Sequence, residues 1–165
     1  MSSMDTFRHL REDHARVLTE LAALADLAQT PERTPREIDE LRGLVVLLER
    51  ECAAHMRAEE EALFPVLAGV MAEAAKTIPP LAAEHAELKD MLATLAGVLA
   101  GTPSRERDEQ IAVQAKDLVD LFRIHVRKEE ALIFRMAERV LSPDSLRHLA
   151  ERLLVHAPDR KGSPS

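Results

Sequence analysis

Two stretches of the chain share one pattern: HMRAEEEALF begins at His55, and HVRKEEALIF begins at His125. Each reads His-x-Arg-x-Glu-Glu, with a phenylalanine nine residues after the histidine. A histidine and a carboxylate four residues apart lie on one face of an α-helix, one turn apart. His55 with Glu59, and His125 with Glu129, also continue apolar stripes with the three- and four-residue spacing of a helix. Both pairs are therefore predicted to point into the core of a helical protein.

The rest of the chain divides into helical segments at clusters of proline, glycine and serine. Between these clusters Ala, Leu, Glu, Arg, Lys and Met dominate, and no segment alternates as a strand would. Pro65 should kink or end its helix because it lacks the N–H and clashes with the preceding turn. Four long helices with short connections predict an all-α fold, an antiparallel up-down-up-down four-helix bundle with a short C-terminal fifth helix. The predicted helices cover about residues 4–29, 35–71, 80–100, 105–141 and 143–156.

The predicted domain spans residues 1–156, followed by a disordered tail over 157–165. The inward face of the fourth helix is expected to continue past Glu129 through Leu132 and Met136, which keep the helical spacing. The leucines of the fifth helix would either cap the bundle or offer a dimer surface, and we favour the cap.

The chain also repeats itself. EDHARVLTELAAL near the N-terminus resembles AEHAELKDMLATL 71 residues later, and the two copies cover about residues 4–71 and 75–141. Each copy supplies a lone histidine on its first helix, His14 or His85, and one His-x3-Glu motif on its second. This duplication predicts a pseudo-two-fold axis down the bundle, with a site near that axis.

The composition disfavours several kinds of partner. Four Phe and no Trp or Tyr leave little for stacking on nucleic-acid bases, and a net charge of −7 is repelled by a phosphate backbone. The N-terminal MSSMDTFRHLREDH lacks the apolar run of a secretory signal, and no apolar run suits a transmembrane helix. The single cysteine, Cys52, cannot form an intramolecular disulfide and fits a reducing compartment. We expect a soluble cytoplasmic protein that binds neither nucleic acid nor membrane.

Six side chains are predicted to converge on one apolar core: His14, His55, Glu59, His85, His125 and Glu129. Burying two unpaired carboxylates is costly, and the inner faces offer too few Lys or Arg to pair them. A pair of metal ions would supply the positive charge that these two carboxylates need. Imidazole and carboxylate together suit iron, manganese or zinc, and six ligands are too many for one tetrahedral zinc. A single histidine on an apolar face is more often a hydrogen-bonded core residue, but four in a duplicated pattern favour a two-metal site.

The order of the motif separates this site from the ferritin-like di-metal bundles, which use Glu-x-x-His. No histidine of this chain has a glutamate three residues before it, whereas His-x3-Glu occurs twice. The remaining acidic residues of the two motifs, Glu60, Glu61 and Glu130, are expected to be solvated.

These residues resemble the hemerythrin-like, or HHE cation-binding, domain family over about residues 4–141. The resemblance rests on four motifs in order: DHARV with His14, HMRAEEEALFP with His55 and Glu59, EHAEL with His85, and HVRKEEALIF with His125 and Glu129. It implies a four-helix bundle that holds two non-haem iron ions joined by an oxo or hydroxo bridge. Glu59 and Glu129 would be bridging carboxylates. One iron would be held by His14 and His55, and the other by His85 and His125. Manganese or zinc would satisfy the same residues in part.

The chain departs from the oxygen-carrying hemerythrins on the third helix, where those proteins carry His-x3-His. Here Lys89 stands four residues after His85, and the site is more symmetric and one ligand short. Lys89 would follow His85 on the inward face, where its ammonium would approach the metals as a catalytic group or pair with Glu51. The alternative is that it extends to solvent at the end of the bundle. Glu51 itself would be that partner or a spare ligand.

The implied function is that of a di-iron protein that binds or reacts with O2, NO or peroxide, in sensing, storage or stress defence. Two irons with open positions disfavour reversible oxygen carriage, because peroxide could bridge them. Two alternatives use the same site: a peroxidase- or catalase-like enzyme that reduces peroxide or O2, and an iron-dependent sensor acting through a protein partner or a homodimer. A metal-free interaction module is a third, which the buried glutamates disfavour.

Overall fold

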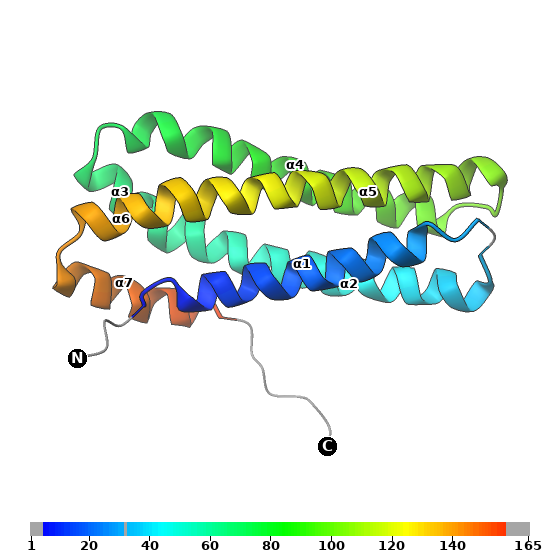
Figure 1. The fold of residues 1–165 in the computed structure, drawn as a ribbon, viewed down its shortest axis with the longest axis horizontal. Coiled ribbons are helices and arrows are strands. Elements are labelled where there is room, and N and C mark those ends of the chain that lie inside the picture. Colours follow the sequence, from blue (N-terminus) through cyan, green and yellow to red (C-terminus); the bar gives the residue numbers. More distant parts are fainter. Residues whose placement is uncertain (1–4, 32, 158–165) are drawn as a thin grey trace, which may run out of the picture.

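The computed structural model describes residues 5–31 and 33–157, and every regular element in these ranges is helical. Four long segments lie side by side along the longest axis of the molecule, and a shorter helix lies at one end (Figure 1). The elements are α1 (Arg8–Ala28), α2 (Pro35–Ala58), η1 (Glu59–Leu63), α3 (Phe64–Val70), α4 (Ala74–Ala100), α5 (Arg105–Lys128), η2 (Glu129–Phe134), α6 (Arg135–Val140) and α7 (Pro143–Val155).

Each long helix packs against two others: α1 and α4 both contact α2 and α5. The chain reverses between consecutive long segments through short connections at the two ends of the molecule (Figure 1). The apolar stripe of each long helix faces the interior between the four helices. Burial of one apolar face per helix is the main favourable contribution to the stability of such a fold. Within the described ranges, no helix has both the length and the apolar character that crossing a membrane requires.

Polar side chains set the starts of several helices. Thr34 caps α2 in a reciprocal pair with Glu37, whose backbone N–H donates to the Thr34 hydroxyl at 3.2 Å. Ser104 and Ser142 cap α5 and α7 by accepting from the third residue of each helix. Such caps satisfy backbone donors that have no partner inside the helix. The predicted starts of α2, α5 and α7 agree with these boundaries.

The predicted start of the third helix was wrong. We expected it near Pro80, but α4 begins at Ala74 and includes Pro79 and Pro80. Ala74 is fully buried in the end of the core. Packing of this first turn therefore outweighs the hydrogen bonds that the two prolines cannot donate.

Both His-x3-Glu motifs run directly into a π-helical turn, η1 or η2, that starts at the glutamate. In η1 the N–H of Phe64 donates to the carbonyl of Glu59, five residues back. Pro65 follows in the first turn of α3, where its missing N–H is tolerated. The second helix thus continues beyond Pro65 with a shifted register rather than ending there.

The prediction of the inward face after Glu129 was wrong because the same register shift occurs at η2. Leu132 is 50% exposed and Met136 is only half-buried, whereas Ile133 and Phe134 are 0% exposed. A π turn holds one more residue than an α turn, so the residues beyond it rotate relative to the helix face. Sequence periodicity carries no signal for this extra residue.

The core consists of two apolar clusters separated by a polar layer. The larger cluster fills the bundle from Ala28 and Ile38 to Met56 and Val126. The smaller cluster closes the end at which α3, α6 and α7 lie (Figure 1). α7 joins it through Leu149 and Leu153 and packs against η1, as expected of a cap. Of the predicted tail, only Ala157 lies within the described residues.

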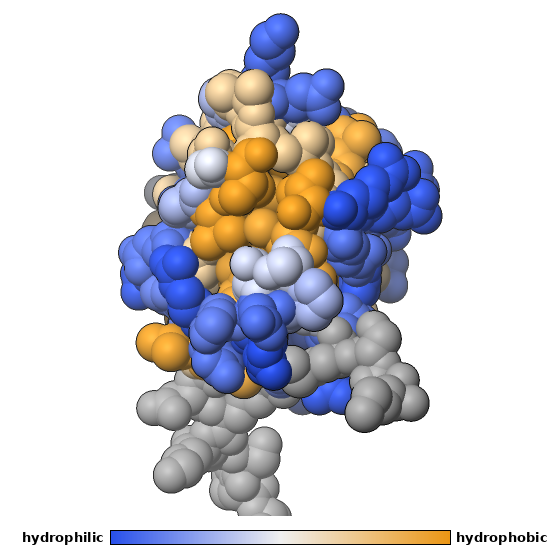
Figure 2. Space-filling view, turned by 90° about the vertical axis from the view of Figure 1, so that its left-hand side faces the viewer, coloured by the Kyte–Doolittle hydropathy of each residue, from blue (hydrophilic) through white to orange (hydrophobic). Residues whose placement is uncertain are grey.

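The capped end carries apolar surface. Figure 2 faces this end and shows an apolar patch surrounded by polar residues. Val70 of α3, Leu132 of η2 and Val140 of α6 are exposed here, and the last two line a shallow pocket of about 260 Å³. Leu132 reaches the surface because of the π turn.

The register shift predicts opposite effects at two neighbouring positions. Ile133→Ala should lower the free energy of unfolding by about 2–5 kcal/mol, because it leaves a cavity in the end cluster. Leu132→Ala, the matched control, should change it by less than about 0.5 kcal/mol. Urea unfolding followed by circular dichroism measures both. Equal losses at the two positions would contradict the π-helical register.

Candidate metal centre

The six side chains that the sequence analysis singled out lie together in the polar layer, and all six are buried. Their exposed fractions are 4% or less, and both glutamates are at 0%. Their nitrogen and oxygen atoms form two groups that could each hold a metal ion, with all atoms of a group within 4.8 Å of one another. We call His14 and His55, with the shared glutamates, the α1–α2 position, and His85 and His125, with the same glutamates, the α4–α5 position.

The two glutamates lie between the two positions. Glu129 directs Oε2 to His14 Nε2 at 3.0 Å and Oε1 to His125 Nε2 at 2.8 Å. Glu59 directs Oε1 to His55 Nε2 at 3.3 Å and Oε2 to His85 Nε2 at 3.2 Å. Each carboxylate thus offers one oxygen to either position, which is the arrangement of a bridging ligand.

Several of these atoms lack hydrogen-bond partners within the described part of the chain. Both oxygens of Glu59, Nε2 of His55 and Nε2 of His125 are buried without one, although ion-pair distances connect them. Unsatisfied buried polar atoms are rare in proteins and call for an explanation. A cation between the imidazoles and carboxylates would satisfy these atoms together, and the mixed nitrogen and oxygen donor set suits iron, manganese or zinc.

The outward nitrogen of each histidine faces a further carboxylate on a neighbouring segment. His14 Nδ1 lies 2.9 Å from Glu130 and His85 Nδ1 lies 2.7 Å from Glu60. His125 Nδ1 lies 2.8 Å from Glu84, and His55 Nδ1 lies 3.5 Å from Asp13. We call these four the outer carboxylates: Asp13, Glu60, Glu84 and Glu130. They fix the ring orientation and direct Nε2 inward, as carboxylates behind metal-ligating histidines do.

A search against protein-family models matches residues 5–137 to the hemerythrin HHE cation binding domain. The chain belongs to this family. Its members bind metal cations, and the buried His/Glu groups are compatible with such a site. A search of the curated proteins finds no significant match.

In this hemerythrin domain the role of the outer carboxylates was not predicted. Glu60 and Glu130 were expected to be solvated, and their side chains are 37% and 38% exposed, but each also contacts a histidine of the site. Asp13 and Glu84 directly precede the lone histidines His14 and His85. Repetition of an acidic residue before each lone histidine was the signal that could have identified them.

The phenylalanine of each motif also has a defined place. Phe134 stacks on His14 with ring centroids 5.8 Å apart, and Phe64 stacks on His85 at 5.7 Å. Each motif therefore covers the lone histidine of the other copy of the repeat. Phe7 stacks on the far side of Phe134 at 4.7 Å and closes the layer with apolar surface.

Lys89 does not point at the glutamates of the site; of the two orientations considered for it, the structure shows the one that extends toward solvent. Its side chain is 46% exposed, and its Nζ lies 3.9 Å from Glu60. Glu51 neither pairs with Lys89 nor joins the site; its Oε2 accepts from Arg16 Nε at 2.9 Å. Lys89 therefore reaches the site only through Glu60 and His85.

The pKa values of the metal-free site favour protonated imidazoles. Burial opposes the charged form of His55, but Glu59 and Asp13 outweigh it and raise the pKa to about 10. Burial likewise opposes the charge of His85, yet Glu129 and Glu59 raise its pKa to about 10. Burial would raise the pKa of Glu129, but the neighbouring imidazoles, His125 first, hold it well below its ordinary value. Without metal, protons supply the positive charge that the glutamates need.

Metal uptake should therefore release protons. At pH 7 both His55 and His85 are protonated in the metal-free protein, so loading should release about two protons or more per chain. Because folding raises the pKa values of His55 and His85, their protonated rings stabilise the metal-free fold. This stabilisation is complete below pH 6.5, the ordinary pKa of histidine, and is lost as the pH rises toward 10. Calorimetry in buffers of different ionisation enthalpy measures the release. Uptake without proton release at pH 7 would show that the imidazoles are already neutral.

Glu60 should matter to metal binding while its neighbour does not. Glu60→Gln weakens the acceptor behind His85 and should lower metal affinity about 10- to 100-fold. Glu61→Gln is the matched control, because Glu61 is mostly exposed and contacts no histidine of the site. Equilibrium dialysis against a chelator-buffered metal series compares the two. Equal affinities would remove Glu60 from the metal centre.

Proposed function

We propose that this protein is a hemerythrin-like di-iron protein that binds or reacts with O2, NO or peroxide. We further propose that its four long segments form an antiparallel up-down-up-down bundle, and that Glu59 and Glu129 bridge the two metals. The observation that carries the proposal is the geometry of these glutamates. Each is fully buried, and each reaches at least one histidine of the α1–α2 position and at least one of the α4–α5 position.

The residues around the site suit a small ligand. All six inner side chains are almost fully buried between two apolar clusters, so a large substrate has no access without unfolding part of the bundle. When bound, two iron ions would supply reversible one- and two-electron chemistry and coordination of a diatomic molecule. The chain contributes the rest. The outer carboxylates hold the Nδ1 protons, the phenylalanines exclude water, and the glutamates keep the ions together.

A sensor function is the second candidate, and one contact favours it. Arg152 of α7 donates to the backbone carbonyl of Glu61 in η1 at 3.0 Å, and η1 carries Glu59. A change of metal state that moves η1 would therefore reach the outside of the molecule through α7. A loss of protease resistance in α7 after iron removal, with turnover of peroxide absent, would favour the sensor over an enzyme.

The proposal predicts metal content directly. Protein from iron-supplied cells should contain two irons per chain and show charge-transfer absorption in the near ultraviolet. Glu59→Ala and Glu129→Ala should each lose at least one iron, because either change removes a ligand shared by both positions. Glu61→Ala should keep both. An intact helical fold with no metal in the unmodified protein would contradict the proposal.

Once loaded, the protein should show which ligand it serves. A reversible spectral change with O2 indicates a carrier, repeated consumption of peroxide indicates an enzyme, and a stable NO complex without turnover indicates a sensor or a scavenger. Stopped-flow absorption with each ligand separates these outcomes.

A further inference from the structure

The capped end of the bundle presents apolar side chains to solvent, and Figure 2 shows apolar surface gathered there. Val70 is 55% exposed, Leu132 50% and Val140 39%. Met71 and Met136 are partly buried and line a pocket of about 260 Å³, as Leu132 and Val140 do. We call these five residues the end patch. An apolar patch with a polar rim marks a site at which a protein contacts another molecule.

Both walls of this pocket continue from the glutamates of the candidate metal centre. One wall is formed by η2 and α6, which run on from Glu129 and supply Leu132 and Val140. The other wall is the end of the segment that starts with η1 at Glu59, passes through α3 and reaches Met71. A molecule seated in the pocket therefore contacts two segments that each begin at a buried glutamate of the site.

Two arginines border the pocket without an acidic partner. Arg135 and Arg139 lie one turn apart on α6, and both are exposed. Among the described residues, no carboxylate lies within 4.0 Å of either guanidinium. Their neighbour Glu138 pairs with Arg11 instead. Glu73 is the one carboxylate among the described residues that line the pocket, so its border carries two positive charges against one negative charge.

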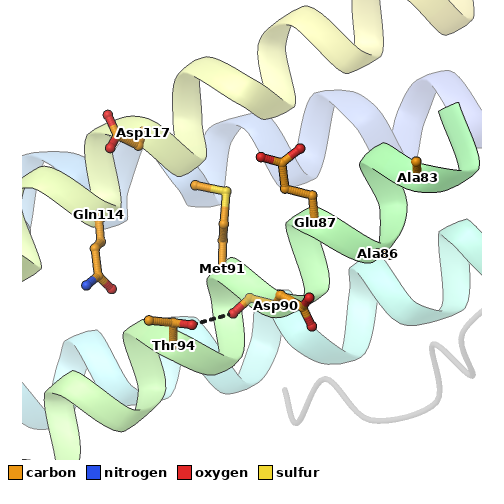
Figure 3. A pocket seen from close by; sticks show the side chains of 8 residues that line it. All are labelled: Ala83, Ala86, Glu87, Asp90, Met91, Thr94, Gln114 and Asp117. Atoms are coloured by element: carbon orange, nitrogen blue, oxygen red, sulfur yellow. Dashed lines mark hydrogen bonds between the residues drawn. The ribbon is translucent and has the colours of Figure 1, made fainter. Parts of the chain in front are cut away.

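One long side of the molecule has the opposite character. A pocket of about 530 Å³ between α4 and α5 is bordered by Glu87, Asp90 and Asp117, and no lysine or arginine of the described residues lines it. Figure 3 shows these side chains along the two helices, where the one hydrogen bond drawn joins the Thr94 hydroxyl to the backbone of Asp90. An acidic partner is therefore repelled by this side and attracted to the end patch.

We propose that the end patch docks an acidic amphipathic helix of a partner protein, and that metal occupancy changes the affinity for this helix. Apolar side chains of the helix enter the pocket beside Leu132. Carboxylates one turn apart on the helix pair with Arg135 and Arg139, which have the same spacing. The dependence on metal rests on the proposed function, whereas the docking itself does not.

Two other occupants fit the end patch less well. A second copy of this chain, docked through the same end, would bring two positively charged borders together, and like charges across an interface are unfavourable. A membrane of anionic lipids would attract the arginines, but the net charge of −7 repels the chain from such a surface. A separate acidic helix has neither disadvantage.

Metal occupancy reaches the end patch through η1 and η2. A cation held by Glu59 and Glu129 fixes the first residue of each π turn, and each turn leads directly into one wall of the pocket. A helix that needs both walls in place binds the loaded protein more tightly. By thermodynamic linkage, the bound helix strengthens metal binding by the same factor.

The test is fluorescence anisotropy of the full chain with a labelled peptide of about 18 residues, which is long enough to form a helix. The peptide carries leucines at helical spacing on one face and glutamates beside them. Two control peptides replace the glutamates by glutamines or the leucines by alanines. The first peptide should bind at least about tenfold more tightly than either control, and higher salt should weaken its binding. Equal binding of the three peptides would overturn the docking.

Variants locate the binding on the chain. Leu132→Ala should weaken it about five- to tenfold, because it removes apolar surface beside the pocket. The same exchange is expected to leave the fold stable, so lost binding is not lost folding. Arg135→Gln and Arg139→Gln should each weaken binding about two- to fivefold. Val113→Ala and Arg123→Gln are the matched controls, because both side chains are exposed on α5 outside the end patch.

Three results would overturn the docking of a partner helix. The first is an equal loss of binding in Arg123→Gln and Arg139→Gln. The second is a dimer in sedimentation velocity that Leu132→Ala removes, which would assign the face to a second copy. The third is binding to vesicles of phosphatidylcholine and phosphatidylserine that Leu132→Ala removes, which would assign the face to a membrane.

The dependence on metal is measured with the same peptide on metal-free and Co²⁺-loaded protein. The loaded protein should bind the peptide about fivefold more tightly or better. Equal affinities would overturn this dependence. A chain that binds the peptide but no metal would refute the proposed function and leave the docking surface standing, whereas a chain that binds two metals but no peptide would do the reverse.

Discussion

Two carboxylates, those of Glu59 and Glu129, are withdrawn from water at the centre of an apolar bundle, and an unpaired charge there costs several kcal/mol. Four imidazoles surround them and are available as ligands to a cation, and in the metal-free protein the raised pKa values of His55 and His85 keep those two rings protonated. The imidazoles thus balance the charge of the glutamates, and the outer carboxylates balance the charge of the imidazoles. The two apolar clusters on either side of this layer exclude water.

In each motif the two successive glutamates and the later phenylalanine make separate contacts, and a π-helical turn starts at the first glutamate. In the first motif Glu59 points inward, while Glu60 reaches the outward nitrogen of His85 on α4. Phe64 then stacks on that same ring. The second motif repeats this arrangement on His14 with Glu129, Glu130 and Phe134. Each copy of the repeat therefore fixes the lone histidine of the other, and the site cannot be complete in one half alone.

The sequence predicted the helices and the six inner residues because both depend on local spacing. Apolar periodicity locates a helix face, and His55 and Glu59 lie on that face whatever the bundle does around them. The errors arose where tertiary packing decides. The π turn moved Leu132 to the surface and Ile133 to the core, and packing of Ala74 extended α4 through two prolines. For Lys89 the spacing left the inward and the solvent-facing orientation open, and the ammonium lies beside the partly exposed Glu60, where it keeps more hydration than inside an apolar layer.

The repeat also shows which parts of such a site are free to change. The inner residues of the two copies match, as the proposed pair of metal ions would require, whereas the residues one layer further out differ. Arg16 on α1 corresponds to Glu87 on α4, and Lys89 on α4 corresponds to Leu18 on α1. A charge at this distance from a metal alters its affinity and preferred charge without disturbing a ligand, and it costs little in folding because it remains partly hydrated. The contacts of Arg16 on α1 and of Lys128 on α5 show this freedom, because neither has a counterpart in the other copy of the repeat while the inner residues match.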